Sequence, residues 1–133
     1  MRNYKLYRQI GRGTFSDVVH GQSLLTGRHV AIKMMKRRYK TKEDVSDIRE
    51  VQTLVRLSGN PHIIKLEDFV YDEVTGKLAL VFEMMSCSLY DVLKDRKTKY
   101  PSDLVDHWMF QLLSGLAFIH SNGIIHRDVS CLI

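Results

Sequence analysis

Three short runs of this chain carry side chains that could handle a phosphate group. Residues 11–18 read Gly-Arg-Gly-Thr-Phe-Ser-Asp-Val, and glycines let a backbone approach phosphate oxygens and offer N–H groups to them. Lys33 lies in an otherwise apolar run, where an unpaired ammonium is costly to desolvate and therefore needs an anionic partner. Asp128, in the run His126-Arg127-Asp128, offers a carboxylate that could act as a general base. Together these runs indicate a site that could bind phosphate groups and act on a proton.

Strand-like sequence flanks the glycine run on both sides. Polar and apolar residues alternate over residues 4–10, and Val18-Val19 continues as a strand. A dinucleotide-binding fold needs a helix directly after its glycines, so the pattern excludes an oxidoreductase of that type. A plain hairpin turn remains the alternative for the glycine run, and a surface lysine in a basic cluster remains the alternative for Lys33.

The order of the motifs resembles the eukaryotic protein kinases of the Ser/Thr type, within the CMGC group and its MAK/MOK-like branch. The resemblance runs from Asn3 to Asp128. It includes the glycine run, with Ser16 in place of the third glycine, and Val30-Ala31-Ile32-Lys33. An Ile48-Arg49-Glu50 helix segment, a Leu80-Val81-Phe82-Glu83 connection and the His-Arg-Asp run follow in the family's order.

The resemblance assigns roles to individual residues. It pairs Lys33 with Glu50 and with the α- and β-phosphates, and it makes Asp128 the catalytic base that orients a substrate hydroxyl. The resemblance also implies that Ala31 would lie against the adenine and that Phe82 would border the back of its pocket. The backbones of Glu83 and Met85 would then form hydrogen bonds with the edge of the adenine. The implied nucleotide-binding set is Ile10, Gly11, Arg12, Gly13, Thr14, Phe15, Ser16, Asp17, Val18, Ala31, Lys33, Glu50, Phe82, Glu83, Met85 and Ser88.

The family's magnesium-holding residues have no counterpart here. Where the family has an asparagine five residues after the aspartate, this chain has Ile133, and no Asp-Phe-Gly run occurs. Ser130 likewise replaces the family's lysine. The resemblance implies ATP and Mg²⁺ as cofactors, and a catalytic domain truncated just after the His-Arg-Asp run. The six histidines are scattered, and no metal site built on them is expected.

The fold class implied is α+β, with a kinase small lobe over residues 1–84 and the hinge and start of an incomplete, mainly helical large lobe over 85–133. Strands are expected at 4–10, 18–21, 29–35, 63–71 and 78–83, with one helix running from a capping box at Thr41 and Asp44 to Gly59. A second capping box at Ser88 and Asp91 predicts a short helix, and Pro101 begins a longer one that Gly123 closes. The long helix carries an apolar stripe, expected to bury itself against the rest of a large lobe: Val105, Trp108, Met109, Leu112, Leu113, Leu116 and Ala117.

The composition and charge of the chain limit the classes of binding partner that are expected. The 133-residue chain has 44% hydrophobic and 26% charged residues and a net charge of +5, with no signal peptide and no apolar run of bilayer length. The densest basic stretch, residues 33–42, is interpreted as solvated surface beside a phosphate site, so neither nucleic acid nor membrane is an expected partner. Two cysteines make no disulfide framework, which favours a cytoplasmic or nuclear location.

Two functions remain open from the sequence. The first is a protein serine/threonine kinase that transfers the ATP γ-phosphate to a protein hydroxyl, with protein substrates or regulatory proteins as partners. The alternative is a non-catalytic nucleotide-binding or regulatory interaction fragment. They differ in whether this chain transfers phosphate by itself.

Overall fold

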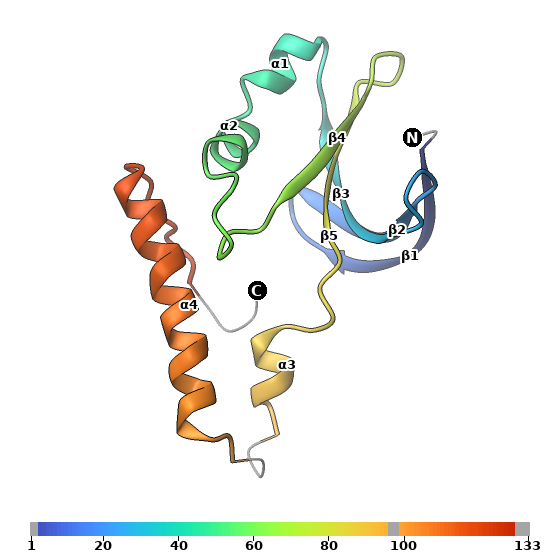
Figure 1. The fold of residues 1–133 in the computed structure, drawn as a ribbon. Helices are drawn as coiled ribbons and strands as arrows, with labels where there is room; N and C mark the ends of the chain where they lie inside the picture. The colour runs from blue at the N-terminus through green and yellow to red at the C-terminus, as the bar shows by residue number, and fades with distance from the viewer. Residues whose placement is uncertain (1–2, 96–98, 130–133) are drawn as a thin grey trace. The chain divides into compact units, whose positions relative to one another are not determined.

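The computed structural model describes residues 3–95 and 99–129 of the chain (Figure 1). The chain divides into two compact units, one containing Met1–Ser58 and Ile64–Met84, the other Gly59–Ile63 and Met85–Ile133. Each unit is described by itself.

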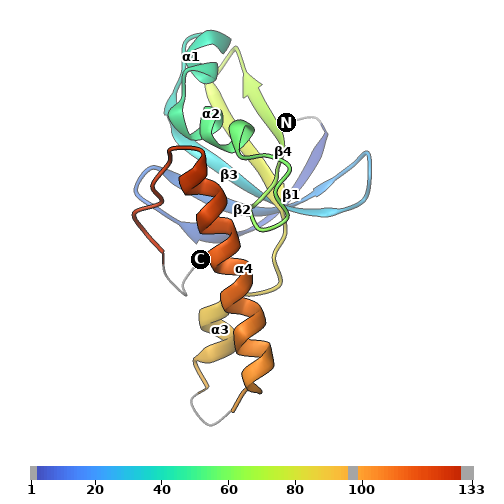
Figure 2. The same ribbon diagram turned by 60° about the vertical axis from the view of Figure 1, so that its left-hand side comes forward.

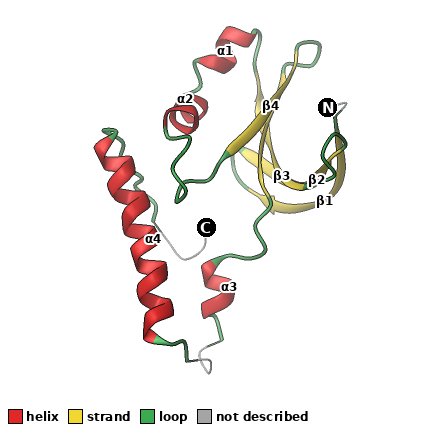
Figure 3. Cartoon of the chain, viewed as in Figure 1, coloured by secondary structure: helices red, strands yellow, loops and turns green. Residues whose placement is uncertain are grey.

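The first unit is built on a five-stranded antiparallel sheet with strand order β1-β2-β3-β5-β4 (Figure 3). Its strands are β1 (Tyr4–Arg12), β2 (Ser16–Ser23), β3 (His29–Arg38), β4 (Leu66–Asp72) and β5 (Lys77–Glu83). The predicted five-stranded sheet is therefore confirmed. β4 begins three residues later than expected, because the turn at Asn60 and Pro61 extends to Ile63, whose N–H donates to the Asn60 carbonyl at 3.2 Å.

Alternate residues of β3 and β5 point to opposite sides of the sheet and build two separate clusters. Val30 and Ile32 pack with Ala79 and Val81 on one side. On the other side, Leu78, Leu80 and Phe82 form a cluster with residues of the helical segment, including Val45 and Val51. One face of the sheet is thus covered by helices (Figure 2).

The helix expected between Thr41 and Gly59 is two helices, α1 (Lys42–Ser46) and α2 (Arg49–Arg56). The capping box predicted at Thr41 and Asp44 is present, but the backbone of Ile48 is extended, with φ −66° and ψ 116°. At 3.6 residues per turn, a continuous helix would place Val45 and Val51 about 120° apart around its axis. The break at Ile48 lets both side chains turn to the sheet, where both are buried.

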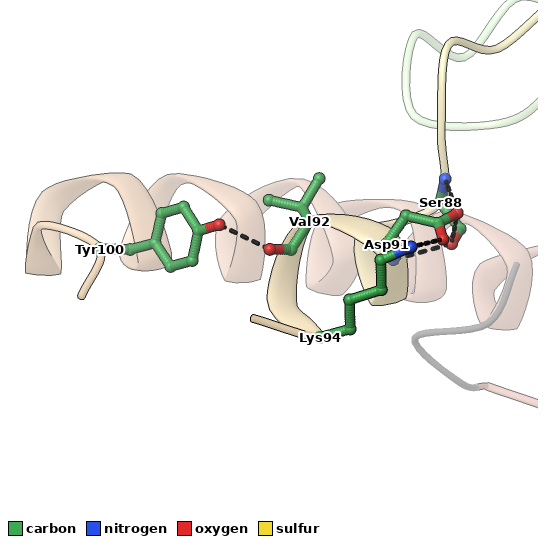
Figure 4. A network of polar contacts seen from close by, with 5 residues as sticks. All are labelled: Ser88, Asp91, Val92, Lys94 and Tyr100. Carbon is green, nitrogen blue, oxygen red and sulfur yellow. Dashed lines mark hydrogen bonds and ion pairs between the residues drawn. The ribbon is translucent and has the colours of Figure 1, made fainter. Parts of the chain in front are cut away.

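The second unit contains a short helix, α3 (Leu89–Leu93), opened by the predicted capping box. The Ser88 hydroxyl donates to Asp91 Oδ2 at 2.8 Å, and the Asp91 N–H donates back to Ser88 Oγ at 3.1 Å (Figure 4). Lys94 Nζ donates to Asp91 Oδ1 at 3.0 Å. These bonds, first from Lys94 and then from Ser88, lower the pKa of the Asp91 carboxyl to about 2. The Tyr100 hydroxyl donates to the Val92 carbonyl at 2.6 Å and ties the segment after α3 to the helix.

The long helix α4 (Ser102–Ser121) follows Pro101, as expected, and Gly123 takes a φ of 70° just after it ends. Its buried residues are Gly115 and Ile119, and Trp108 contacts the Tyr100 ring at 5.4 Å between centroids. A Cβ at position 115 would lie 3.0 Å from the His62 carbonyl oxygen, so this glycine permits a close approach between helix and turn. Of the predicted stripe, Val105, Met109, Leu112 and Leu113 are exposed. In the described parts of the chain, no helix combines the length and apolar character needed to cross a membrane.

Candidate functional site

The glycine run forms the connection between β1 and β2. The Gly13 N–H donates to the Ser16 carbonyl at 2.8 Å and closes a tight turn. Phe15, within this turn, is 78% exposed. Ser16 and Val18 already belong to β2, so the run folds back along the sheet rather than into a helix. This is the strand–turn–strand arrangement that the sequence predicted.

Lys36, on β3, ties this turn to the neighbouring strand. Its N–H donates to the Phe15 carbonyl at 3.0 Å, and its Nζ donates to the Gly13 carbonyl at 2.6 Å. The same ammonium lies 3.3 Å from Asp17 Oδ1. Asp17 thus pairs with a lysine of the sheet, and the turn is restrained by a residue outside the predicted site.

The strand register contains the signal that could have identified Lys36. Val18 pairs with Lys33 and Ser16 with Met35, so the next step along the antiparallel pair places residue 36 beside residue 15. In the sequence alone, Lys36 belongs to the basic stretch of residues 33–42 that is interpreted as solvated surface.

Lys33 and Glu50 meet as the sequence predicted. Lys33 Nζ lies 2.5 Å from Glu50 Oε1, and the two side chains are 28% and 37% exposed. Lys33 is held by β3, between Val18 of β2 and Leu80 of β5. Glu50 lies in the first turn of α2, where the positive end of the helix dipole favours a carboxylate. An ammonium has three donors, so the open side of this pair leaves Lys33 able to bind a second anion.

Apolar residues lie on the same face of the sheet as Lys33. Ala31 is two residues before Lys33 and therefore points to the same side of the sheet. Val18, the cross-strand partner of Lys33 on β2, points to this side as well. Ala31 pairs with Phe82 of β5, which is buried in the cluster beneath the helices. The face thus combines an ion pair, small and branched apolar side chains, and a glycine turn at the end of β1.

The protein kinase domain matches residues 4–130. The chain belongs to the protein kinase family.

Its relatives within the kinase family are of the MAK/MOK and cyclin-dependent types, which confirms the expected CMGC placement. The human MAPK/MAK/MRK overlapping kinase is 43% identical over 129 residues, covering 97% of this chain and 31% of that protein. The rice (Oryza sativa subsp. japonica) cyclin-dependent kinase F-3 is 37% identical, and the rat (Rattus norvegicus) serine/threonine-protein kinase MAK is 38% identical. Both alignments cover 97% of this chain, with 29% and 20% of the respective relatives. The chain spans less than a third of the length of these curated relatives.

The remaining kinase site residues are distributed over both units. Ile10, Gly11 and Arg12 end β1, and Glu83 ends β5 in the first unit. Met85 and Ser88 belong to the second unit, where Met85 is exposed and the Ser88 hydroxyl is engaged by Asp91. Their contacts to a nucleotide stay a prediction.

The His-Arg-Asp run of the kinase family follows α4 in the second unit. Asp128 is exposed, and its N–H donates to His126 Nδ1 at 3.3 Å. Arg127 has a φ of 68°, in the left-handed region that non-glycine residues seldom adopt. Such strained positions cluster at functional sites. Ser130 and Ile133, at the positions of the missing lysine and asparagine, lie outside the described residues.

Proposed function

We propose that this chain forms the nucleotide-binding part of an ATP-dependent protein serine/threonine kinase. The observation that carries the proposal is the Lys33–Glu50 ion pair, on the same sheet face as Val18 and Ala31. A partly exposed ammonium, already fixed by one carboxylate, suits binding of a phosphate oxygen without the cost of ordering a free lysine. The family match over residues 4–130 supports the same conclusion.

The residues present fit ATP. Lys33 would bind the α- and β-phosphates, Glu50 would fix the Lys33 rotamer, and the glycine turn would offer backbone N–H groups to the phosphates. Ala31 and Phe82 would contact or border the adenine, with the backbones of Glu83 and Met85 at its edge. Bound ATP supplies the transferable γ-phosphoryl group. Asp128 would accept or orient the hydroxyl proton of a protein substrate.

The described residues do not fit a bound metal ion such as Mg²⁺. No group of three or more His, Cys, Asp or Glu side chains placed to hold a metal occurs within residues 3–95 and 99–129. We therefore assign no step to a metal held by this chain. The second candidate function is a non-catalytic nucleotide-binding or regulatory fragment.

Partners and location follow from the same proposal. A protein carrying a serine or threonine hydroxyl, or a regulatory protein, would be the macromolecular partner. The thiol of Cys87 is free and exposed, which suits the reducing cytoplasm or nucleus.

A comparison of Lys33→Met with Lys65→Met tests the proposal on the 133-residue chain. Lys65 is an exposed lysine of the same sequence and serves as the matched control. We expect ATP to raise the melting temperature of the wild type and of Lys65→Met but not of Lys33→Met. An equal ATP shift in all three proteins, or none in the wild type, would contradict nucleotide binding at Lys33.

A phosphotransfer assay with ATP and Mg²⁺ then separates the two functions. Transfer to a general protein substrate that Lys33→Met abolishes supports the kinase. A nucleotide-dependent shift without transfer supports the non-catalytic module.

A further inference from the structure

The glycine turn is held by a single lysine of the neighbouring strand. Lys36 Nζ donates to the Gly13 carbonyl at 2.6 Å, and the Lys36 N–H donates to the Phe15 carbonyl at 3.0 Å. The same ammonium lies 3.3 Å from Asp17 Oδ1, which is shielded from water and accepts no hydrogen bond from the described residues. Arg12 Nε is 4.0 Å from this oxygen, so Lys36 provides the nearer positive charge.

Lys36 acts from the face of the sheet opposite to Lys33. The two residues are three positions apart on β3, and side chains alternate between the two faces of a strand. Met34 packs against one core cluster and Met35 against the other, so the alternation holds up to the residue before Lys36. Asp17 lies directly opposite Met34 and is therefore a diagonal neighbour of Lys36 on the same face.

The direction of the peptide group between Gly13 and Thr14 follows from the bond to Lys36. No peptide bond in the described residues is cis, and the C=O and N–H of a trans peptide point in opposite directions. The carbonyl of this peptide belongs to Gly13 and is held toward Lys36. Its N–H belongs to Thr14 and therefore points away from Lys36, toward the face on which Lys33 lies. The Thr14 N–H donates to no group of the described residues, so it is free to bind a ligand.

We propose that Lys36 is a positioning residue for the phosphates of a nucleotide, a role that rests on the nucleotide-binding function proposed above. By holding the Gly13 carbonyl, Lys36 presents the Thr14 N–H to a phosphate oxygen bound at Lys33. Without this bond, the permissive backbone of Gly13 lets the peptide group rotate, and its carbonyl oxygen then faces the phosphates and repels them. A hydrogen bond from an N–H to a charged oxygen is stronger than one between neutral groups. Adenosine has no phosphate and makes no use of this N–H.

Calorimetric titrations of the 133-residue chain with ATP and with adenosine test this role. We expect Lys36→Met to bind ATP about tenfold more weakly than the wild type, the size expected for one hydrogen bond, with unchanged affinity for adenosine. Lys36→Arg should restore the affinity for ATP, because a guanidinium also donates to the Gly13 carbonyl and pairs with Asp17. Lys40→Met is the matched control, because it removes the same charge from an exposed lysine of the same basic stretch, and it should bind ATP as the wild type does.

The Thr14 amide signal of the wild type gives a second measurement that needs no variant to fold. In NMR titrations we expect ATP to shift this signal and adenosine to leave it nearly unchanged. A Thr14 signal that ATP does not move would overturn the proposal. Equal losses of ATP and adenosine affinity in Lys36→Met, or a loss of ATP affinity in Lys40→Met as large as in Lys36→Met, would overturn it as well.

The variant Lys33→Met separates this role from nucleotide binding itself. ATP binding that Lys33→Met abolishes and Lys36→Met retains at the wild-type affinity would overturn the role of Lys36 alone. No ATP binding by the wild type would overturn both the role of Lys36 and the proposed nucleotide site.

Discussion

The sheet unit and the helical unit of this chain differ in how they bury apolar residues. Among the residues that the structure describes, every buried hydrophobic residue except Ile119 belongs to the first unit. Ile32 lies on β3 between β2 and β5 of the five-stranded sheet, and its side chain packs with Ala79 and Val81 and is fully buried. By contrast, α4 buries only part of its circumference and leaves Met109, Leu112 and Leu113 exposed. A sheet covered by helices on one face can bury its apolar residues within its own unit. A single helix can bury its apolar residues only where another element packs against them.

The largest expected effect comes from removing a fully buried side chain of the sheet. Ile32 is 0% exposed and Leu113 is 57% exposed. We expect Ile32→Ala to lower the free energy of unfolding by about 2–5 kcal/mol, since it removes buried surface and leaves a cavity. Leu113→Ala should change it by less than about 0.5 kcal/mol, as at other exposed sites. Urea denaturation followed by circular dichroism measures both, and equal effects would contradict the difference between the units.

Two glycines with positive φ, one in each unit, differ in how closely other atoms surround them. Gly76, in the β4–β5 turn, has a φ of 67°, and a Cβ there would lie 2.5 Å from the Tyr39 carbonyl oxygen. Gly123 has a φ of 70° with nothing within 4 Å of such a Cβ. The backbone conformation alone costs a non-glycine residue about 1–2 kcal/mol, so Gly123→Ala should lose about this much. Gly76→Ala should lose more, because a backbone atom must also move. Thermal unfolding measures the loss of stability in each variant. A larger loss in Gly123→Ala than in Gly76→Ala would contradict the role of the close backbone contact at Gly76.

Lys36→Met tests the restraint on the glycine turn. It removes the Nζ bond to Gly13 and the ion pair with Asp17, both partly exposed, so the free energy of unfolding should change by about 1 kcal/mol or less. Amide hydrogen exchange of residues 13–16 should become faster, while the exchange of β5 stays as in the wild type. Unchanged exchange in the turn would show that Lys36 does not restrain it.

The smallest effect is a pH dependence confined to α3. The pKa of Asp91 is lowered to about 2, so its bonds to Lys94 and Ser88 favour the capped helix while the carboxylate is charged. That contribution is fully present above the ordinary carboxyl pKa of about 3.9 and is lost as the pH falls toward 2. NMR titration of the Asp91 carboxyl should show the low pKa in the wild type and a higher one in Lys94→Met. An identical titration in both proteins would remove Lys94 as the main cause.

Short sequence patterns predicted the features that depend only on residues close together in the chain. The capping boxes at Thr41 and Ser88 formed because each needs only residues three positions apart. The break at Ile48 could not be predicted, because apolar residues three positions apart are typical of one continuous helix. Only packing against the sheet determines that Val45 and Val51 must both face it. The contacts of Lys36 and the 2.8 Å hydrogen bond between the rings of His20 and His29 could not be predicted for a related reason, since only the strand register brings these residues to their partners.

The family and the five strands could be predicted from the sequence, because they follow from motif order and from the alternation of residue types. The need of Lys33 for an anionic partner followed from its apolar neighbours, and the resemblance to the kinases named Glu50 as that partner. Only the folded chain showed which lysine holds the glycine turn, where the helical segment divides, and that His20 and His29 meet. Those outcomes depend on the pairing of residues distant in sequence, which the register and twist of the assembled sheet alone define.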